Sequence, residues 1–162
     1  MNAANRFIKL VQHPIKFKLF LLTRLPSAFF CGVRVQSISE ENAVVTVPYK
    51  WLSQNPFKST YFACLAMAAE MSTGLLSMMN TYQQQPAISM LVTGLEVSYF
   101  KKATSRTYFT CQDGAAIKNC IEEAIKTGDG VSIKAKSTGR NAAGETVAEF
   151  YITWSFKAKG SR

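Results

Sequence analysis

The chain has 162 residues, of which 48% are hydrophobic and 18% are charged, and it carries a net charge of +9. This size and composition fit one domain over residues 1–162 with a full apolar core, and they exclude a disordered chain. The four cysteines form no C-x-x-C pair and His13 is the only histidine, so we expect no metal site. The basic charge favours an anionic partner, but no zinc-finger, RNP or KH signature is present, so we expect no nucleic acid.

The first 39 residues contain six lysines and arginines and no acidic residue. Residues from Arg6 to Leu25 predict a helix that is broken or kinked at Pro14. A targeting segment, an interfacial helix, or a helix pair docked on the domain would each produce such a pattern. Because the apolar residues are large and numerous, we favour a docked helical extension over residues 1–26. We expect a cytoplasmic protein and favour docking over membrane contact.

Three hairpins are predicted from alternating polar and apolar residues. The first joins Phe29–Ile38 to Ala43–Tyr49, and the second joins residues 89–100 to 105–112 through a turn at 101–104. The third joins 131–140 to 145–158 through the turn Asn141–Gly144. Between the second and third hairpins, residues 114–127 predict an amphipathic helix that ends at Gly128.

Residues 59–79 predict a helix unlike any other in the chain. Ser59 or Thr60 can cap it, and Glu70 is the one charged residue between Lys58 and Glu96. A helix with no polar face must be covered on all sides, and its many small residues let other backbone approach closely. We therefore expect an α+β fold in which a curved antiparallel sheet wraps around this central helix, and not a transmembrane span.

The stretch NPFKSTYFACLAMAAE, residues 55–70, resembles a motif of hotdog-fold acyl-CoA thioesterases of the phenylacetyl-CoA thioesterase type. In that motif an Asn in a loop is followed by His-Gly-Gly at the helix start and by an Asp or Glu within the helix. Asn55 matches the Asn, Tyr61-Phe62-Ala63 replace His-Gly-Gly, and Glu70 matches the acid. The sequence is most similar to a less characterised hotdog branch, with residues 28–157 as the hotdog core.

The resemblance implies hydrolysis of an acyl-CoA or acyl-carrier thioester, with coenzyme A as part of the substrate and no other cofactor. Glu70 would activate water or attack directly, Asn55 would position water or the carbonyl, and the Phe62 amide would hold the oxyanion. Burial raises the pKa of a carboxyl and makes it a stronger base, and free N–H groups at a helix start suit a negative oxygen. We expect the Phe62 side chain itself to point away, into the core.

The same resemblance implies a homodimer, with a dimer of dimers as a further possibility, because each site combines the helix start of one protomer with the acid of the other. Tyr61 and Ala63 would lie beside the substrate. Thr73 lies one helical turn after Glu70 and is placed to hydrogen-bond it. Lys101 and Lys102, at the turn of the second hairpin, would meet the phosphates of coenzyme A.

Three alternatives remain open at this point. One is a membrane-surface protein that uses its basic N-terminus. The loss of His-Gly-Gly fits a non-catalytic module that binds acyl-CoA or lipid. Glu70 also fits a buried acid that is hydrogen-bonded for structural reasons, and Asn55 fits a plain turn residue before Pro56.

Overall fold

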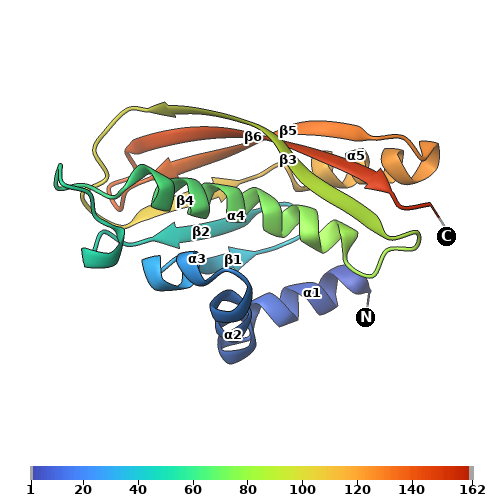
Figure 1. Ribbon diagram of the computed structural model, residues 1–162, viewed down its shortest axis with the longest axis horizontal. Coiled ribbons are helices and arrows are strands. Elements are labelled where there is room, and N and C mark those ends of the chain that lie inside the picture. Colours follow the sequence, from blue (N-terminus) through green and yellow to red (C-terminus); the bar gives the residue numbers. More distant parts are fainter. Residues whose placement is uncertain (1, 161–162) are drawn as a thin grey trace.

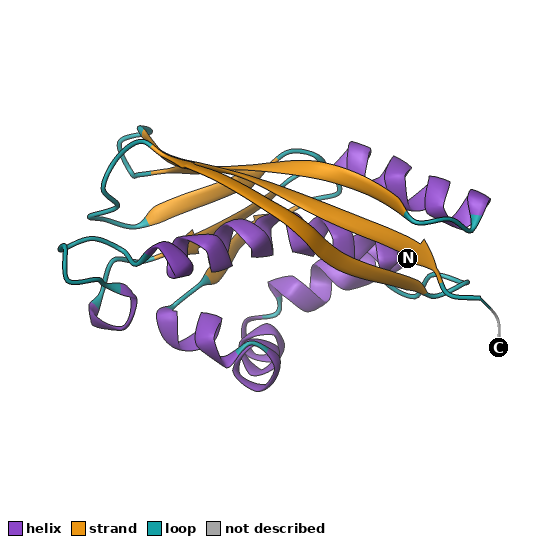
Figure 2. Cartoon of the chain, turned by 45° about the horizontal axis from the view of Figure 1, so that its top comes forward, coloured by secondary structure: helices purple, strands orange, loops and turns teal. Residues whose placement is uncertain are grey.

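The computed structural model describes residues 2–160, which form one antiparallel sheet and five α-helices (Figures 1 and 2). The sheet has six strands in the order β1-β2-β4-β5-β6-β3. The elements in chain order are α1 Ala3–Gln12, α2 Pro14–Arg24, α3 Pro26–Cys31, β1 Arg34–Ile38, β2 Ala43–Val47, η1 Trp51–Ser53, α4 Phe62–Thr81, β3 Ile88–Tyr99, β4 Thr107–Cys111, α5 Gly114–Thr127, β5 Val131–Arg140 and β6 Thr146–Ala158.

Helix α4 is the centre of the molecule. In Figure 1 it runs between β5 and β6 on one side and β1 and β2 on the other, and it contacts these four strands and β4. Ala68, Ala69 and Leu76 are fully buried. The hydroxyls of Ser72 and Ser137 lie 2.7 Å apart where the helix meets β5. This arrangement is a hotdog fold, as the sequence predicts.

The length and apolar composition of α4 would allow it to cross a membrane, and it is the one such helix within residues 2–160. Two-thirds of its most apolar window is nevertheless buried inside the molecule. Its apolar character is therefore accounted for by the sheet and helices that cover it.

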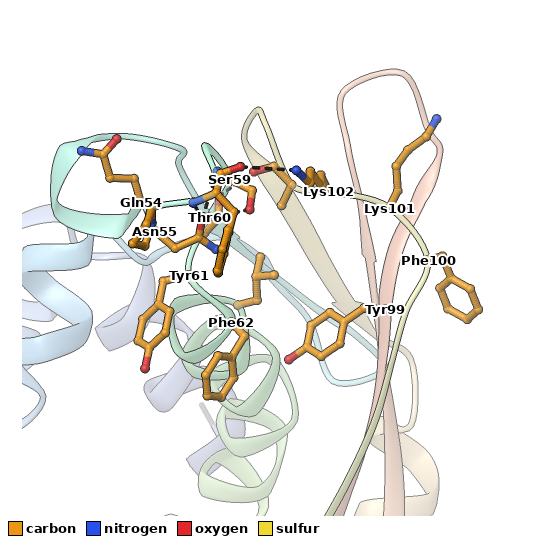
Figure 3. A pocket seen from close by; sticks show the side chains of 14 residues that line it. Gln54, Asn55, Ser59, Thr60, Tyr61, Phe62, Tyr99, Phe100, Lys101 and Lys102 are labelled. Carbon is orange, nitrogen blue, oxygen red and sulfur yellow. Dashed lines mark hydrogen bonds between the residues drawn. The ribbon is translucent and has the colours of Figure 1, made fainter.

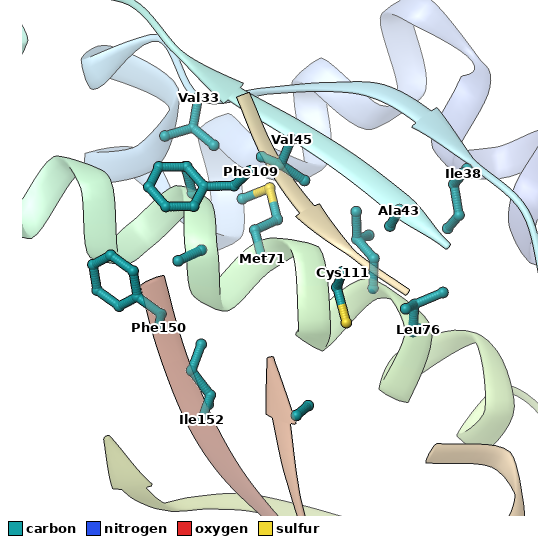
Figure 4. Close-up of a cluster of buried hydrophobic side chains, with 14 of the residues drawn as sticks. Val33, Ile38, Ala43, Val45, Met71, Leu76, Phe109, Cys111, Phe150 and Ile152 are labelled. Atoms are coloured by element: carbon teal, nitrogen blue, oxygen red, sulfur yellow. The ribbon is translucent and has the colours of Figure 1, made fainter. Parts of the chain in front are cut away.

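The core between α4 and the sheet is filled by branched and aromatic side chains (Figure 4). In β6 the alternation predicted from the sequence is confirmed, because one face is buried throughout: Ala148, Phe150, Ile152, Trp154 and Phe156. Phe150 packs edge-to-face on Phe109 of β4, with ring centroids 5.5 Å apart. The helix and the sheet thus share one continuous apolar core.

The N-terminal extension is the predicted helix pair, broken at Pro14. The imidazole Nδ1 of His13 accepts hydrogen bonds from the amides of Ile15 and Lys16 and so caps α2. Phe7, Val11, Phe17 and Leu21 are buried, and α1 contacts β1 and α4. The extension is therefore docked on the hotdog core, as expected.

The start of the first predicted strand is wrong. Residues 26–31 form α3, which begins at Pro26 and ends at Gly32, whose φ of 84° is the left-handed conformation that terminates a helix. The strand itself begins at Arg34. The alternation of residues from Phe29 to Ile38 resembles a strand throughout. The ends of α3 are set by Pro26 and Gly32, which the apolar pattern does not reveal.

The second predicted hairpin is also wrong. Strand β3 pairs with β6 from Ile88–Ala158 to Tyr99–Ala148, whereas β4 pairs with β2 and β5. The connection at 100–106 therefore leads from the edge of the sheet to its middle, past the start of α4. Alternation within a strand identifies its buried face but does not identify its partner.

Gly139 lies where β5 packs against the core. A Cβ added there would lie 2.5 Å from Cε1 of the buried Phe109 ring. We predict that Gly139→Ala lowers the free energy of unfolding by about 1–3 kcal/mol because the ring has to move. Urea denaturation would measure it, with Gly130→Ala as the matched control, since a Cβ at Gly130 meets nothing within 4 Å. Equal stability of the two variants would contradict the packing described.

Candidate functional site

The loop before α4 is organised by the side chain of Asn55. Its Oδ1 accepts hydrogen bonds from the amides of Phe57 and Ser59 at 3.0 and 3.2 Å, and from the Ser59 hydroxyl at 3.2 Å. Lys58 in the same loop has a φ of 57°, a conformation that needs such support in a residue with a Cβ. Asn55 thus stabilises the turn through its side-chain oxygen, and its NH₂ group donates to no residue within 2–160.

Helix α4 begins without a side-chain cap. Tyr61 is the N-cap, and the Ser59 and Thr60 hydroxyls are engaged elsewhere, with Thr60 donating to the Ala103 carbonyl at 3.0 Å. The predicted cap at Ser59 or Thr60 is therefore wrong. Because the first amides of a helix have no intrahelical acceptor, the N–H of Phe62 is available to a ligand at the positive end of the helix dipole.

A pocket of about 810 Å³ opens in front of this helix start. It brings together five of the residues singled out in the sequence, and its walls also include side chains that sequence reasoning missed, among them Gln54, Phe57, Leu65 and Tyr99. The five are Asn55, Tyr61, Phe62, Lys101 and Lys102. Tyr99 ends β3, and no local pattern could have placed it here because the partner of β3 was not predictable.

The two lysines of the pocket lie differently (Figure 3). The Lys102 ammonium bends over the loop and donates to the Phe57 carbonyl at 3.4 Å. The Lys101 ammonium points away from the pocket and pairs with Glu145 in the turn before β6. Lys102 is therefore the better placed of the two to meet an anionic group at the pocket mouth.

The ring of Phe62 does not enter the core, so that expectation is wrong. Its side chain is 57% exposed, lines the pocket, and packs edge-to-face on Tyr61 with ring centroids 4.9 Å apart (Figure 3). The first residue of α4 lies before the fully covered part of the helix. The ring therefore narrows the pocket at the place where glycine would leave the backbone open.

Glu70 lies outside this pocket, in a cleft between α4 and the N-terminal extension. Two adjoining cavities there, of about 240 Å³ each, are lined by Glu70, Met71, Arg24 and Leu25, and by Phe17 and Phe20 of α2. A Cβ added at Gly74 would lie 3.2 Å from Oε1 of Glu70, so the glycine provides room for the carboxylate. Apart from Arg24, the neighbours of this acid in the cleft are mostly small or apolar.

Burial raises the pKa of the Glu70 carboxyl above its ordinary value. Within residues 2–160 its carboxylate takes part in no ion pair and no hydrogen bond, although Arg24 lines the same cleft. The hydrogen bonds expected of a purely structural acid are therefore not found in the described part of the chain. A carboxyl with a raised pKa in a cleft is a candidate for acid–base chemistry.

Thr73 and Ala63 line neither space. Thr73 is fully buried; its hydroxyl donates to the backbone carbonyl of Glu70 at 3.0 Å and accepts from the Trp154 indole N–H at 2.9 Å. It therefore joins α4 to β6 and does not touch the Glu70 carboxylate. Ala63 is half-buried in the first turn of α4.

The same region holds another potential nucleophile, the thiol of Cys64. Burial, together with the Cys31 thiol 3.4 Å away, raises the pKa of Cys64 to about 12, so this thiol stays protonated and is a poor nucleophile. Among residues 2–160 no group of three or more His, Cys, Asp or Glu side chains could hold a metal ion. Glu70 is thus the candidate catalytic group of this region.

The two parts of the candidate site are separated in one protomer. Phe62 and Glu70 are eight residues apart on the same helix, which corresponds to about 12 Å along its axis. The Asn55 amide and the Phe62 N–H lie at one pocket, and the Glu70 carboxylate lies at the other cleft. One protomer therefore does not bring the Glu70 carboxylate and the Phe62 N–H into the same space.

Solved structures with this fold include several bacterial proteins. A protein of unknown function from Chlorobaculum tepidum superposes with a TM-score of 0.75 at 19% identity, covering 89% of this chain and 93% of its own. The PaaI protein of the phenylacetic acid degradation operon of E. coli gives 0.65 at 12% identity, covering 99% and 98%. A thioesterase from Haemophilus influenzae gives 0.62 at 12% identity, covering 86% and 88%.

At these identities the similarity establishes the hotdog fold. A sequence comparison with curated proteins finds no match. The family model described as a domain of unknown function, DUF4442, matches residues 16–156. Because this match spans most of the chain, the protein belongs to the DUF4442 family, within the hotdog fold.

Proposed function

We propose that the protein is a homodimeric thioesterase that hydrolyses an acyl-CoA or a related acyl thioester. The observation that carries this proposal is Glu70, a carboxylate with a raised pKa and no partner among the described residues, in an apolar cleft on the helix that begins beside Asn55. The thioesterase from Haemophilus influenzae, which shares the fold, supports the reaction class.

The roles follow from the chemistry of thioester hydrolysis. The Glu70 carboxylate removes a proton from water as the water oxygen bonds to the thioester carbonyl carbon. The carbonyl oxygen becomes negative and is held by the Phe62 amide at the helix start, with the free NH₂ group of Asn55 as a second donor. When the carbon–sulfur bond breaks, its electron pair leaves with the thiolate. The thiolate then takes from Glu70 the proton that came from water.

A second copy of the chain completes the site. Strand β3 pairs only with β6 within residues 2–160, so its other edge is open, and it carries exposed apolar side chains, including Leu91 at 64% and Leu95 at 54%. An open apolar edge favours pairing with another strand. A two-fold pairing there would bring the partner's Glu70 toward the pocket of Asn55 and Phe62. Pairing of two such dimers remains a further prediction.

The substrate is divided between the two spaces. The pocket mouth with Lys102, and with Lys101 if it leaves Glu145, suits the phosphates of coenzyme A or of a carrier-bound phosphopantetheine. The cleft beside Glu70 offers Phe17, Phe20 and Met71 to an acyl chain. Tyr61 contributes an aromatic wall to the pocket. The proposed compartment is the cytoplasm.

The second candidate is a non-catalytic module that binds acyl-CoA or lipid. One observation favours it: the Phe62 ring occupies the wall of the pocket where His-Gly-Gly would leave space. A bound thioester would then lie too far from the amide for hydrolysis, while the apolar cleft could still accept its chain.

The first prediction concerns turnover. Purified protein should release free thiol from at least one member of an acyl-CoA panel, and Glu70→Gln should lower kcat/KM by about 100-fold or more because it removes the base. Asn55→Ala should lower kcat/KM as well. The control is Glu122→Gln, which removes one exposed carboxylate from α5. Saturable binding without turnover would instead support the non-catalytic binding module. If the protein showed neither turnover nor binding, both candidate functions would be refuted.

The second prediction concerns pH and does not depend on turnover. Burial disfavours ionised Glu70 in the folded state, so the wild type loses stability as pH rises from the ordinary glutamate range through the raised pKa. Glu70→Gln lacks this loss. The free energy of unfolding of the variant minus that of the wild type should therefore grow over this window and stay constant above it. A pH-independent difference in urea denaturation would show that Glu70 is not desolvated.

The third prediction separates a shared site from a site within one protomer. Subunits carrying Asn55→Ala and Glu70→Gln are co-expressed with different tags, and the mixed dimer is purified through both. One of the two sites in the mixed dimer then has both native residues, so the dimer should show about half of the wild-type activity, more than either parent dimer. A mixed dimer no more active than its parents would place Asn55 and Glu70 in the same protomer's site.

A further inference from the structure

Helix α2 has an outward face that the docking of the extension leaves uncovered. Its inner face is buried through Phe17 and Leu21, and the same spacing on the other side gives Ile15, Leu19 and Leu22. These three side chains are 72%, 56% and 40% exposed. The helix is therefore apolar on two opposite faces, and the hotdog core accounts for only one of them.

The charge around this outward face has a single sign. Lys16 and Lys18 are exposed and flank the apolar side chains on either side, and residues 1–39 contain no acid at all. Figure 1 shows α2 as the outermost element on the side of α4 that lies away from β5 and β6, and Figure 2 shows it equally uncovered. No other described element covers it.

We propose that this face of α2 binds the surface of an anionic lipid bilayer. An apolar stripe flanked by lysines suits the boundary between lipid headgroups and acyl chains, where the stripe is buried and the ammonium groups meet phosphates. The opposite face of α2 stays docked through Phe17 and Leu21, so the protein lies on the bilayer and does not span it.

A second copy of the chain fits the same face less well. Two copies meeting there would bring Lys16 and Lys18 of one near the lysines of the other, and residues 1–39 offer no carboxylate to offset them. The apolar residues alone are compatible with a bilayer or with a second copy of the chain. The positive charge around them favours the anionic bilayer.

Co-sedimentation of the full chain with vesicles tests this surface. The protein should bind vesicles of phosphatidylcholine mixed with phosphatidylglycerol, should not bind phosphatidylcholine alone, and should be released by salt. Ile15→Gln combined with Leu19→Gln should lower the partition coefficient by about tenfold or more. Lys16→Gln combined with Lys18→Gln should lower it roughly 30-fold.

The matched control for the charge change is Lys118→Gln combined with Lys126→Gln, on the exposed face of α5 far from α2. It removes the same charge and should change the partition coefficient by less than about twofold. Thermal unfolding checks that all variants fold; positions 15 and 19 are exposed, so they should.

Three results would overturn the proposal. One is no binding to anionic vesicles at low salt. Another is equal binding by the wild type and the Ile15→Gln, Leu19→Gln variant. The third is that the Ile15→Gln, Leu19→Gln variant changes its oligomeric state in sedimentation velocity while its vesicle binding stays unchanged. That result would assign this face of α2 to a second copy of the chain.

Discussion

The structure depends on the need to cover a helix that has no polar face. Helix α4 contacts strands β1, β2, β4, β5 and β6, and α1 and α3 as well, so its burial defines both the curvature of the sheet and the position of the extension. Small residues such as Ala68 and Gly74 let backbone and indole ring approach closely. Burial of apolar surface is the dominant favourable term in folding, and α4 and the strands around it share one core. An ionisable group placed on it is desolvated by the same contacts, which is why Glu70 has a raised pKa.

The sequence predicts the central helix, the helix pair before it and the buried face of β6, because each rests on a local pattern: the absence of a polar face, Pro14, and strict alternation. It does not predict that β3 pairs with β6. That pairing joins residues about 60 positions apart, and nothing within either strand specifies the partner. The missed α3 has the opposite cause, since Pro26 and Gly32 do mark its ends but the alternation around them resembles a strand.

In the candidate site too, the sequence predicts what neighbouring residues determine and misses what distant residues contribute. Asn55, Tyr61 and Phe62 adjoin in sequence and in space, so the motif was sufficient to place them together. Tyr99 reaches their pocket only through the connection from β3 to β4, and the separate cleft of Glu70 depends on how α2 docks. Thr73 is placed correctly along the helix, yet its hydroxyl donates to the Glu70 backbone carbonyl and accepts from the Trp154 indole, so it does not reach the carboxylate. Spacing along a helix gives the direction of a side chain but not the partner that the sheet brings to it.

Helix α2 connects the two proposals through its geometry. Phe17 and Phe20 line the cleft beside Glu70, while Ile15 and Leu19 face outward from the same few turns. If the outward face rests on lipid, a substrate whose chain is dissolved in that lipid would have only the thickness of one helix to pass, without entering bulk water. The rate of the proposed hydrolysis would then follow the two-dimensional density of substrate in the bilayer and not its bulk concentration, so adding inert lipid would dilute the substrate and slow that hydrolysis.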